Sequence, residues 1–316
     1  MASARPLLPT DLLALVSYNG KVYPNEARTR ERLGESEPDG NMFETAIEQW
    51  LSFAVRRNAW ISSRRQRLLG LVSARRRGGR QAWEIDCLID TTPSRDAVAG
   101  LLECAIRAGG KAGAEKLFLR LNANSALLQI AMSAGFSAYC SKRLYVGSAL
   151  ALPVDLSLDL RPFSQADQYP AFRLYNCALP ERSRRAEAAT FGEWQAAQER
   201  QWLKNGGVEL VLDGEGGLLA HVRAAKVDQG TLIDARVAGE AVDAAPAMMH
   251  AAFRATGSVG PVLTLIHEAD VDLASRLEAL GFEAREEFFS LMCRTTRVAK
   301  MPKLVPASIP NGAVIT

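Results

Sequence analysis

Two carboxylates in the first part of the chain could carry acid–base chemistry. Glu84 and Asp86 stand in the stretch AWEIDCLID, where they alternate with apolar residues. Successive side chains of a β-strand point to opposite faces, so both carboxylates would lie on one face of such a strand. A carboxylate in that position can act as a general base that removes a proton from an ammonium group, directly or through water. The alternative is a solvent-facing pair on a half-buried strand.

Histidine and cysteine offer little competing chemistry. Residues 1–150 contain no His, so no Ser-His-Asp or Cys-His arrangement competes with Glu84 there. The three His and five Cys of the chain show neither metal-ligand spacing nor a C-x-x-C pair. We therefore expect no metal site. Scattered Cys among apolar neighbours are typical of a reduced compartment, and we expect a cytoplasmic protein.

Charge is distributed unevenly along the chain. Residues 1–150 carry 21 Lys and Arg against 14 Asp and Glu, whereas the remainder carries 17 against 21. Nine Arg and no acidic residue fall within residues 51–80. Such a cluster could attract nucleic acid, an acidic protein or a phosphorylated ligand. Because no stacking aromatic residues and no nucleic-acid module accompany it, we expect a solvated hairpin and helix face without specific nucleic-acid binding.

The elements that would position these residues can be predicted from the spacing of apolar residues. Strands over residues 67–74 and 82–90 flank Gly78-Gly79, which marks a β-hairpin. The other expected elements are, in chain order, amphipathic helices over residues 10–18 and 43–56, a helix with Thr92 as N-cap and Pro93 at its first position that stops at Gly109-Gly110, a strand over residues 116–121, a helix over residues 125–133 and a strand over residues 136–146.

The same series of elements returns later in the chain. Four segments recur in the same order, at separations that fall from 156 to 146 residues. A period of that length corresponds to a whole domain rather than to a solenoid repeat. The repeated pairs begin at Arg5 and Arg161, at Leu68 and Leu218, at Leu101 and Met248, and at Ala134 and Leu280.

We therefore predict two related domains, residues 1–148 and 149–298, followed by an extended or disordered tail over residues 299–316. A chain of 316 residues is long enough for two domains that each bury a core. Strands outnumber crossover helices, so each domain should be a mixed α/β sheet rather than a doubly wound one. No segment reaches 18 uninterrupted apolar residues and the start lacks the apolar core of a signal peptide, so we expect no membrane association.

The order of elements resembles the GNAT superfamily of N-acetyltransferases, and the resemblance covers both domains. In that family a strand is followed by an Asn, a helix, and a Gly-Phe pair eleven residues after the Asn. Asn124 stands eleven residues before Gly135, and Asp270 stands eleven residues before Gly281. The resemblance implies two tandem GNAT-like acyl-CoA N-acyltransferase domains with acetyl-CoA as the co-substrate.

The resemblance also assigns residues of the first domain to acetyl-CoA. The stretch AWEIDCLID is similar to the family's fourth strand, which separates from the fifth and offers backbone groups to the pantetheine. The family binds the CoA pyrophosphate at the start of the next helix, through a loop of the form R/Q-x-x-G-x-G/A. Glu84 resembles the Glu of the histone-acetylating branch. The residues so assigned to acetyl-CoA are Cys87, Leu88, Ile89, Asp90, Ser94, Arg95 and Asn124.

Both domains depart from the family's pattern. The loop PSRDAV of the first domain contains no Gly. In the second domain, Glu240 and Asp243 place negative charge near the matching loop, where carboxylates would repel a diphosphate. The Tyr that often protonates the CoA thiolate is replaced by Ala131 in one domain and Leu277 in the other, and neither can donate a proton.

From these residues we expect an N-acetyltransferase that transfers an acetyl group from acetyl-CoA to an amine of a small molecule or peptide. The first domain would hold CoA, and the second would be catalytically silent. The alternative is an inactive pseudo-acetyltransferase that acts as a binding or structural scaffold. Glu84 and Asn124 favour the enzyme, whereas the missing Gly loop and the missing Tyr favour the scaffold.

Overall fold

The computed structural model describes residues 3–8, 23–34, 58–64, 67–92, 95–155, 157–204 and 206–295. The helices expected over residues 10–18 and 43–56 lie outside the described residues, as do the tail over residues 299–316 and the dipeptide Pro93-Ser94.

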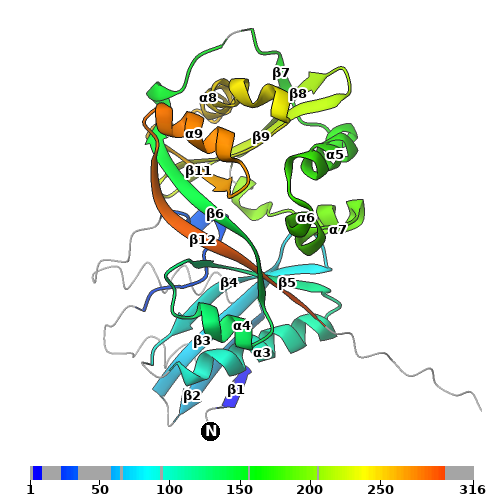
Figure 1. The fold of residues 1–316 in the computed structure, drawn as a ribbon. Coiled ribbons are helices and arrows are strands. Elements are labelled where there is room, and N and C mark those ends of the chain that lie inside the picture. The colour runs from blue at the N-terminus through cyan, green and yellow to red at the C-terminus, as the bar shows by residue number, and fades with distance from the viewer. Residues whose placement is uncertain are drawn as a thin grey trace, which may run out of the picture.

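Twelve strands of the described residues form one mixed sheet (Figure 1). The first six are β1 (Ser3–Pro6), β2 (Asn58–Arg64), β3 (Arg67–Arg76), β4 (Ala82–Asp90), β5 (Lys116–Asn122) and β6 (Ser137–Ser148). The other six are β7 (Leu160–Pro162), β8 (Val208–Gly214), β9 (Gly217–Val227), β10 (Gly230–Val237), β11 (Pro261–His267) and β12 (Glu283–Arg294). Their order across the sheet is β1-β2-β3-β4-β5-β12-β6-β11-β10-β9-β8-β7, which confirms the mixed α/β class. We call β1–β6 with their helices the N-terminal half, and β7–β12 with theirs the C-terminal half.

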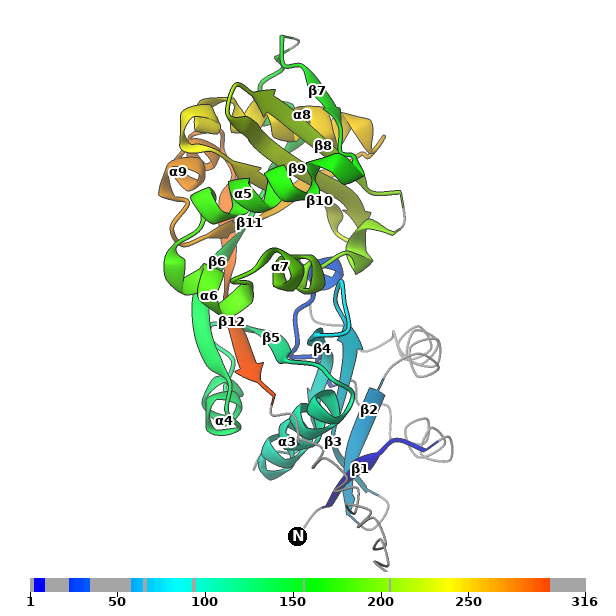
Figure 2. The same ribbon diagram turned by 90° about the vertical axis from the view of Figure 1, so that its right-hand side faces the viewer.

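Helices pack against the sheet in both halves. The N-terminal half contains α3 (Asp96–Lys111), α4 (Leu128–Ser133) and the short 3₁₀ turn η1 (Arg30–Arg32). The C-terminal half contains α5 (Gln168–Ala178), α6 (Glu181–Glu187), α7 (Phe191–Ala197), the 3₁₀ helix η5 (Gly239–Ala244), α8 (Ala245–Ala255) and α9 (Val271–Ala279). Figure 2 shows α6 and α7 between the two parts of the molecule. Among these helices of the described chain, none is both long and apolar enough to cross a membrane.

The helix after β4 differs from its expected course. It begins at Asp96, so Pro93 is not its first residue, and its N-cap is Arg95, whose φ of 55° lies in the left-handed region. The helix also continues through Gly109 and Gly110, and the chain turns at Gly113 with a φ of 86°. Both helical glycines are buried, so packing of this helix face outweighs their low helix propensity.

The last strand of each half pairs with the other half. β12 lies between β5 and β6, while β6 lies between β12 and β11. Leu291 of β12, for example, lies opposite Leu119 of β5 in an antiparallel ladder. The sheet therefore crosses the boundary between the predicted domains, and the halves share backbone hydrogen bonds. The boundaries at residues 1–148 and 149–298 stay a prediction.

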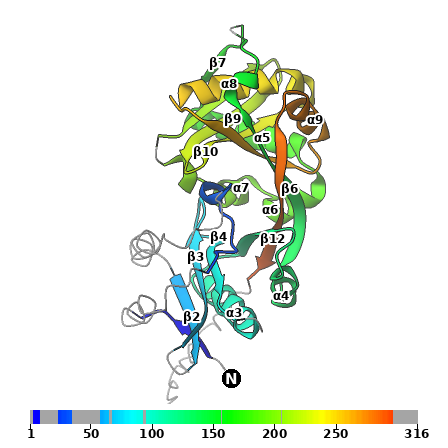
Figure 3. The same ribbon diagram turned by 90° about the vertical axis from the view of Figure 1, so that its left-hand side faces the viewer.

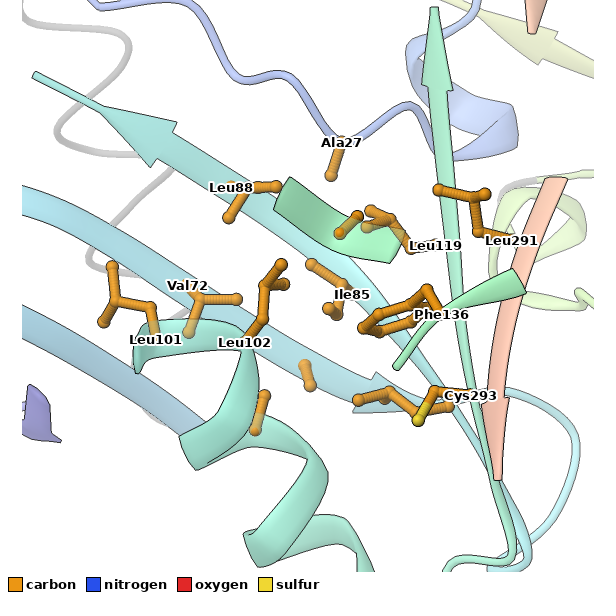
Figure 4. Packing of buried hydrophobic residues seen from close by; sticks show 14 of the residues in the cluster. Ala27, Val72, Ile85, Leu88, Leu101, Leu102, Leu119, Phe136, Leu291 and Cys293 are labelled. Carbon is orange, nitrogen blue, oxygen red and sulfur yellow. The ribbon is translucent and has the colours of Figure 1, made fainter. Parts of the chain in front are cut away.

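The exchanged strands complete the hydrophobic core of the opposite half. Leu291 and Cys293 of β12 pack in the cluster that contains Leu102 of α3 (Figure 4). Tyr145 of β6 packs in the cluster that contains Met248 of α8. Because apolar burial is the main favourable contribution to folding, separating the halves would expose both cores to water.

Candidate active site

In the N-terminal half, β4 and β5 run parallel and then separate. They pair only from Ala82 to Glu84 of β4, opposite Lys116 to Phe118 of β5. Beyond Glu84, no strand of the described residues pairs with the edge of β4 that faces β5. This is the edge to which the sequence assigns acetyl-CoA. We call the unpaired region between the two strands the N-terminal gap.

Residues 25–28, which we call the inserted segment, fill the N-terminal gap. Asn25 Oδ1 accepts a hydrogen bond from Leu88 N at 2.8 Å, and Asn25 Nδ2 donates to Asp86 O at 3.0 Å. Glu26 N donates to Leu88 O at 2.9 Å. The inserted segment therefore satisfies the backbone groups on the open edge of β4, as a strand or an extended ligand would.

The inserted segment reaches β5 as well. Arg28 N donates to Arg120 O at 2.9 Å. Ala27 is fully buried in the same cluster as Leu88 and Leu119 (Figure 4). The backbone of Leu88 is thus already occupied, which corrects its assignment as an open edge for acetyl-CoA.

The neighbouring residues of β4 are also engaged. Cys87 is buried in a small apolar cluster with Leu71, and Ile89 packs against the same cluster. Asp90 Oδ1 accepts hydrogen bonds from Thr92 N at 3.1 Å and from Thr92 Oγ1 at 3.0 Å. Thr92 therefore forms a turn with Asp90 and does not cap the helix, which corrects its expected role.

The described residues assigned to the CoA pyrophosphate and to the next helix come from different elements, because Arg95 precedes α3 and Asn124 follows β5. The side chains of Arg95 and Asn124 are exposed, and neither makes a hydrogen bond to another described residue. Ser94 lies outside the described residues. Their role in binding acetyl-CoA stays a prediction.

Glu84 and Asp86 are buried, with exposed fractions of 4% and 2%. Arg75 Nε donates to Glu84 Oε1 at 2.6 Å, and Arg77 Nε donates to Glu84 Oε2 at 3.3 Å. Ser73 Oγ donates to Asp86 Oδ1 at 2.6 Å. Burial raises the pKa of Glu84, and the two guanidinium groups act in the opposite direction. The expected solvent-facing pair is therefore wrong, and the role of Glu84 as a base stays a prediction.

The Arg-rich hairpin docks on the end of α7. Gly78 N and Gly79 N both donate to Ala196 O, at 2.9 and 3.1 Å. A Cβ atom on Gly78 would lie 2.3 Å from Gln195 O, so only glycine allows this approach. Arg77 is 7% exposed and donates through Nη1 to Ala197 O. The hairpin joins the two halves and buries Arg77, whereas Arg76 and Arg80 are exposed, so the expectation of a solvated hairpin is wrong for Arg77.

A carboxylate of the C-terminal half anchors this contact. Glu199 Oε1 accepts hydrogen bonds from Arg120 Nη2 at 2.7 Å and from Arg77 Nη2 at 3.2 Å. Glu199 Oε2 also lies 3.3 Å from Arg30 Nε. These three guanidinium groups of the N-terminal half hold the pKa of Glu199 well below its usual value, although burial acts to raise it.

In the C-terminal half, β10 and β11 repeat the parallel arrangement but leave an open gap. They pair only from Thr231 to Ile233 of β10. Apart from its pairing with β9, the backbone of residues 235–237 has no hydrogen bond from another described residue. We call this unpaired region the C-terminal gap. A cavity of about 200 Å³ lies against it, and its lining includes Cys177, Arg236, Val237, Val242, Asp270 and Leu273.

The charges around the C-terminal gap are largely balanced. Arg236 Nη1 donates to Asp270 Oδ2 at 3.4 Å. Burial raises the pKa of Asp270, and Arg236 opposes that shift. Asp243 forms an ion pair with Arg276, and Glu240 is exposed. The repulsion expected from Asp243 is therefore offset by a neighbouring cation.

His267 lies at the end of β11, beside the C-terminal gap. Its Nδ1 accepts a hydrogen bond from Ala269 N, so Nε2 carries the proton and donates to Ser183 Oγ at 3.0 Å. Burial, followed by Lys142 and Arg236, lowers the pKa of His267 to about 4. The imidazole is neutral at pH 7, and both of its nitrogens are engaged.

Two residues that shape these gaps, Arg236 and Asn25, belong to no motif recognised in the sequence. Arg236 follows Asp234 by two residues on β10, as Asp86 follows Glu84 on β4. This alternation of polar residues is the sequence signal that could have identified Arg236. Asn25 belongs to a segment without helical or strand periodicity, so no local pattern marks it.

Solved structures with a similar fold cover most of the chain. A tandem GNAT protein from the clavulanic acid biosynthesis pathway, solved without acetyl-CoA, is 14% identical over 93% of this chain and 98% of its own, with a TM-score of 0.51. A GCN5-related N-acetyltransferase from Sphaerobacter thermophilus is 13% identical over 94% of this chain and 98% of its own, with a TM-score of 0.53. At these identities the likeness shows the fold alone. No family model and no curated protein matches the sequence.

Proposed function

The chain has the tandem fold of the GCN5-related N-acetyltransferases, and from this premise we propose that it transfers an acetyl group from acetyl-CoA to an amine. The proposal assigns acetyl-CoA to the C-terminal gap rather than to the N-terminal domain that the sequence favours. One observation carries this assignment: the edge of β10 is open, whereas the matching edge of β4 is hydrogen bonded to the inserted segment.

The residues around the C-terminal gap fit an acyl-CoA molecule. The open backbone of residues 235–237 can pair with the amide groups of the pantetheine, as a neighbouring strand would. The cavity of about 200 Å³ at this edge gives the arm a place to enter. The pyrophosphate would then lie beyond β10 along η5 and not at the start of α8, where Ala245 N is bonded to Val242 O and Pro246 has no N–H group.

The chemistry requires a neutral amine. When bound, acetyl-CoA supplies a thioester whose carbonyl carbon accepts the amine nitrogen, so that an N–C bond forms, the C–S bond breaks and the thiolate leaves to take up a proton. Asp270 is our candidate for the base that removes the proton of the ammonium group. It lines the cavity, and its raised pKa makes it a better proton acceptor than an ordinary Asp. Leu277 stands where the family often has a Tyr, so the thiolate would be protonated from solvent.

Cys177 provides a direct test, because it is exposed and lines the cavity. We expect millimolar acetyl-CoA to slow the alkylation of Cys177 by iodoacetamide, measured by peptide mass spectrometry. Cys104 is a half-buried internal control on α3, and its alkylation should not change. Arg236→Met should weaken the protection of Cys177, whereas Arg95→Glu should leave it unchanged.

Three outcomes would count against the proposal. Unchanged alkylation of Cys177 in saturating acetyl-CoA would remove acetyl-CoA from the C-terminal gap. Protection lost in Arg95→Glu but retained in Arg236→Met would return the site to the N-terminal half. Protection of Cys177 without turnover of any amine would support the scaffold alternative.

A further inference from the structure

A second, smaller cavity lies where the two halves meet. It has a volume of about 50 Å³, and both halves contribute to its lining. Figures 2 and 3 show the blue turn η1 next to α7 in this region. We call it the central cavity. Its charged lining residues are Arg30, Lys142, Glu187, Glu199, Arg223 and Arg236.

Lys142 has no direct ion-pair partner in this wall, although its charge lowers the pKa of Glu187 and of Glu199. Its side chain is 3% exposed, and its ammonium group makes no hydrogen bond and no ion pair within 4.0 Å with any described residue. In the sheet it lies opposite His267 of β11 and Phe288 of β12, and neither supplies a negative charge. A buried ammonium group without a direct hydrogen-bond acceptor among the described residues is costly, so its place in the cavity wall fits an anionic ligand.

The arginines of the same wall already have partners. Asp234 accepts hydrogen bonds from Arg30 Nη2 at 3.1 Å and from Arg223 Nε at 3.2 Å, while Arg236 is bound to Asp270. Arg30 still has an Nη1 group without an acceptor among the described residues. The wall therefore keeps one ammonium group and one guanidinium N–H group ready to bind an acceptor of hydrogen bonds.

We propose that the central cavity binds the carboxylate group of the acceptor, so that the acceptor is a small amine that also carries a carboxylate, as an amino acid does. This inference rests on the proposed function. A cavity of about 50 Å³ holds a few water molecules, and therefore a carboxylate group, but not a nucleotide.

The position of the cavity agrees with this role. Arg236 lines both the central cavity and the cavity at the C-terminal gap. A carboxylate held at Lys142 would therefore leave the amine of the same molecule on the side of Arg236 and Asp270. That is where the proposed function requires a deprotonated amine to meet the acyl group.

Binding can be measured on the full chain by tryptophan fluorescence, because Trp194 lines the central cavity. We expect saturable binding of sodium acetate and of glycine at constant ionic strength. Lys142→Met should weaken both by about tenfold or more, as expected for the loss of a charge-assisted hydrogen bond. Lys226→Met removes an exposed lysine of β9 and should bind like the wild type. Ethylammonium chloride, which lacks a carboxylate, should not bind.

Folding can be checked independently. Lys142→Met replaces a buried cation by an apolar side chain of similar length, so the lost attraction to Glu187 and Glu199 is offset by a smaller desolvation cost and the melting temperature should stay close to that of the wild type. Failure of the wild type to bind acetate, or equal binding by the folded Lys142→Met variant, overturns the carboxylate site. Acetate binding without protection of Cys177 by acetyl-CoA would overturn the proposed function but leave the site. Protection of Cys177 by acetyl-CoA without acetate binding would support the proposed function but overturn the carboxylate site.

Discussion

The two gaps arise from the same repeated elements, yet within the described residues one is filled and the other is open. In the N-terminal half the chain after β1 returns as the inserted segment, which bonds Leu88 and Arg120 across the gap. In the C-terminal half the chain after β7 forms α5 instead, and Cys177 near its end lines the cavity at the gap. The segment after the first strand therefore decides which gap is filled. The motifs of the gap itself do not decide it.

Several arginines of the N-terminal half are buried at its contact with the C-terminal half. In the N-terminal half the gap is filled. Glu199 contacts its Arg30, Arg77 and Arg120, and α7 contacts its hairpin. The same region in the C-terminal half keeps Arg236 beside an open cavity. We infer that the first copy mainly supports the structure and that the second carries the chemistry.

The largest expected effect is on turnover. Asp270→Asn should lower the rate of acetyl transfer by about 10²- to 10⁴-fold, the usual contribution of a general base. Asp272→Asn is the matched control, because Asp272 lines the same cavity but is exposed on the first turn of α9. Acetyl transfer can be followed by release of free CoA thiol. Equal rates for Asp270→Asn and the wild type would remove Asp270 from the reaction.

Glu199 should have the largest effect on stability. Glu199→Gln leaves three guanidinium groups without their shared carboxylate, and removing one member of a buried ion pair costs about 3–5 kcal/mol. Urea unfolding measures this loss. Glu240→Gln, at an exposed position of η5, should stay within about 0.5 kcal/mol of the wild type. A loss for Glu199→Gln as small as that of the control would mean that the ionic contact between the halves is unimportant.

The inserted segment can be loosened without touching the C-terminal gap. Asn25→Ala removes the hydrogen bonds to Leu88 N and Asp86 O and should lower the free energy of unfolding by about 1–3 kcal/mol. Asn58→Ala, on the exposed start of β2, is the control for a simple loss of an Asn side chain. Protection of Cys177 by acetyl-CoA should be unchanged in Asn25→Ala. Lost protection would show that the two gaps are coupled.

The free energy of unfolding should depend on pH through His267, and this effect should be smaller than those above. The folded pKa of His267 is lowered from 6.5 to about 4, so the unfolded chain binds a proton at a higher pH than the folded protein does. Stability from this group is therefore present above about pH 6.5 and is lost as the pH falls towards 4. His267→Gln should reduce the difference between urea midpoints measured at pH 7 and pH 5. An identical difference in the variant would contradict the neutral, buried imidazole.

The smallest expected effect lies at Arg95, the residue that the sequence favours for the CoA pyrophosphate. Its side chain is exposed at the start of α3, next to the filled gap. We expect Arg95→Glu to change the apparent affinity for acetyl-CoA by less than about twofold, as for an exposed side chain without a role. A thermal-shift titration with acetyl-CoA measures this. A tenfold loss of affinity would support the original assignment to the N-terminal half.

The repetition, the strand β4 and the hairpin at Gly78 could be predicted from the sequence, because each depends on local periodicity or on turn residues. The same holds for the mixed α/β fold class. Local patterns were less reliable at the start of α3, where Arg95 rather than Thr92 precedes the helix. The path of the chain as it leaves β4 outweighs the helix propensity and the capping preferences of these residues.

Only the tertiary structure decided how the two copies combine. The pairing of β12 with β5 joins residues far apart in the chain, and alternating apolar residues do not specify which strand will be their partner. The burial of Arg77 and Glu84 depends on α7 and on Glu199 from the other half, so composition alone suggested a solvated surface. Asn25 fills a gap whose shape exists only after β4 and β5 have separated. The sequence therefore determined which elements form, and long-range packing determined which of the two gaps stays open.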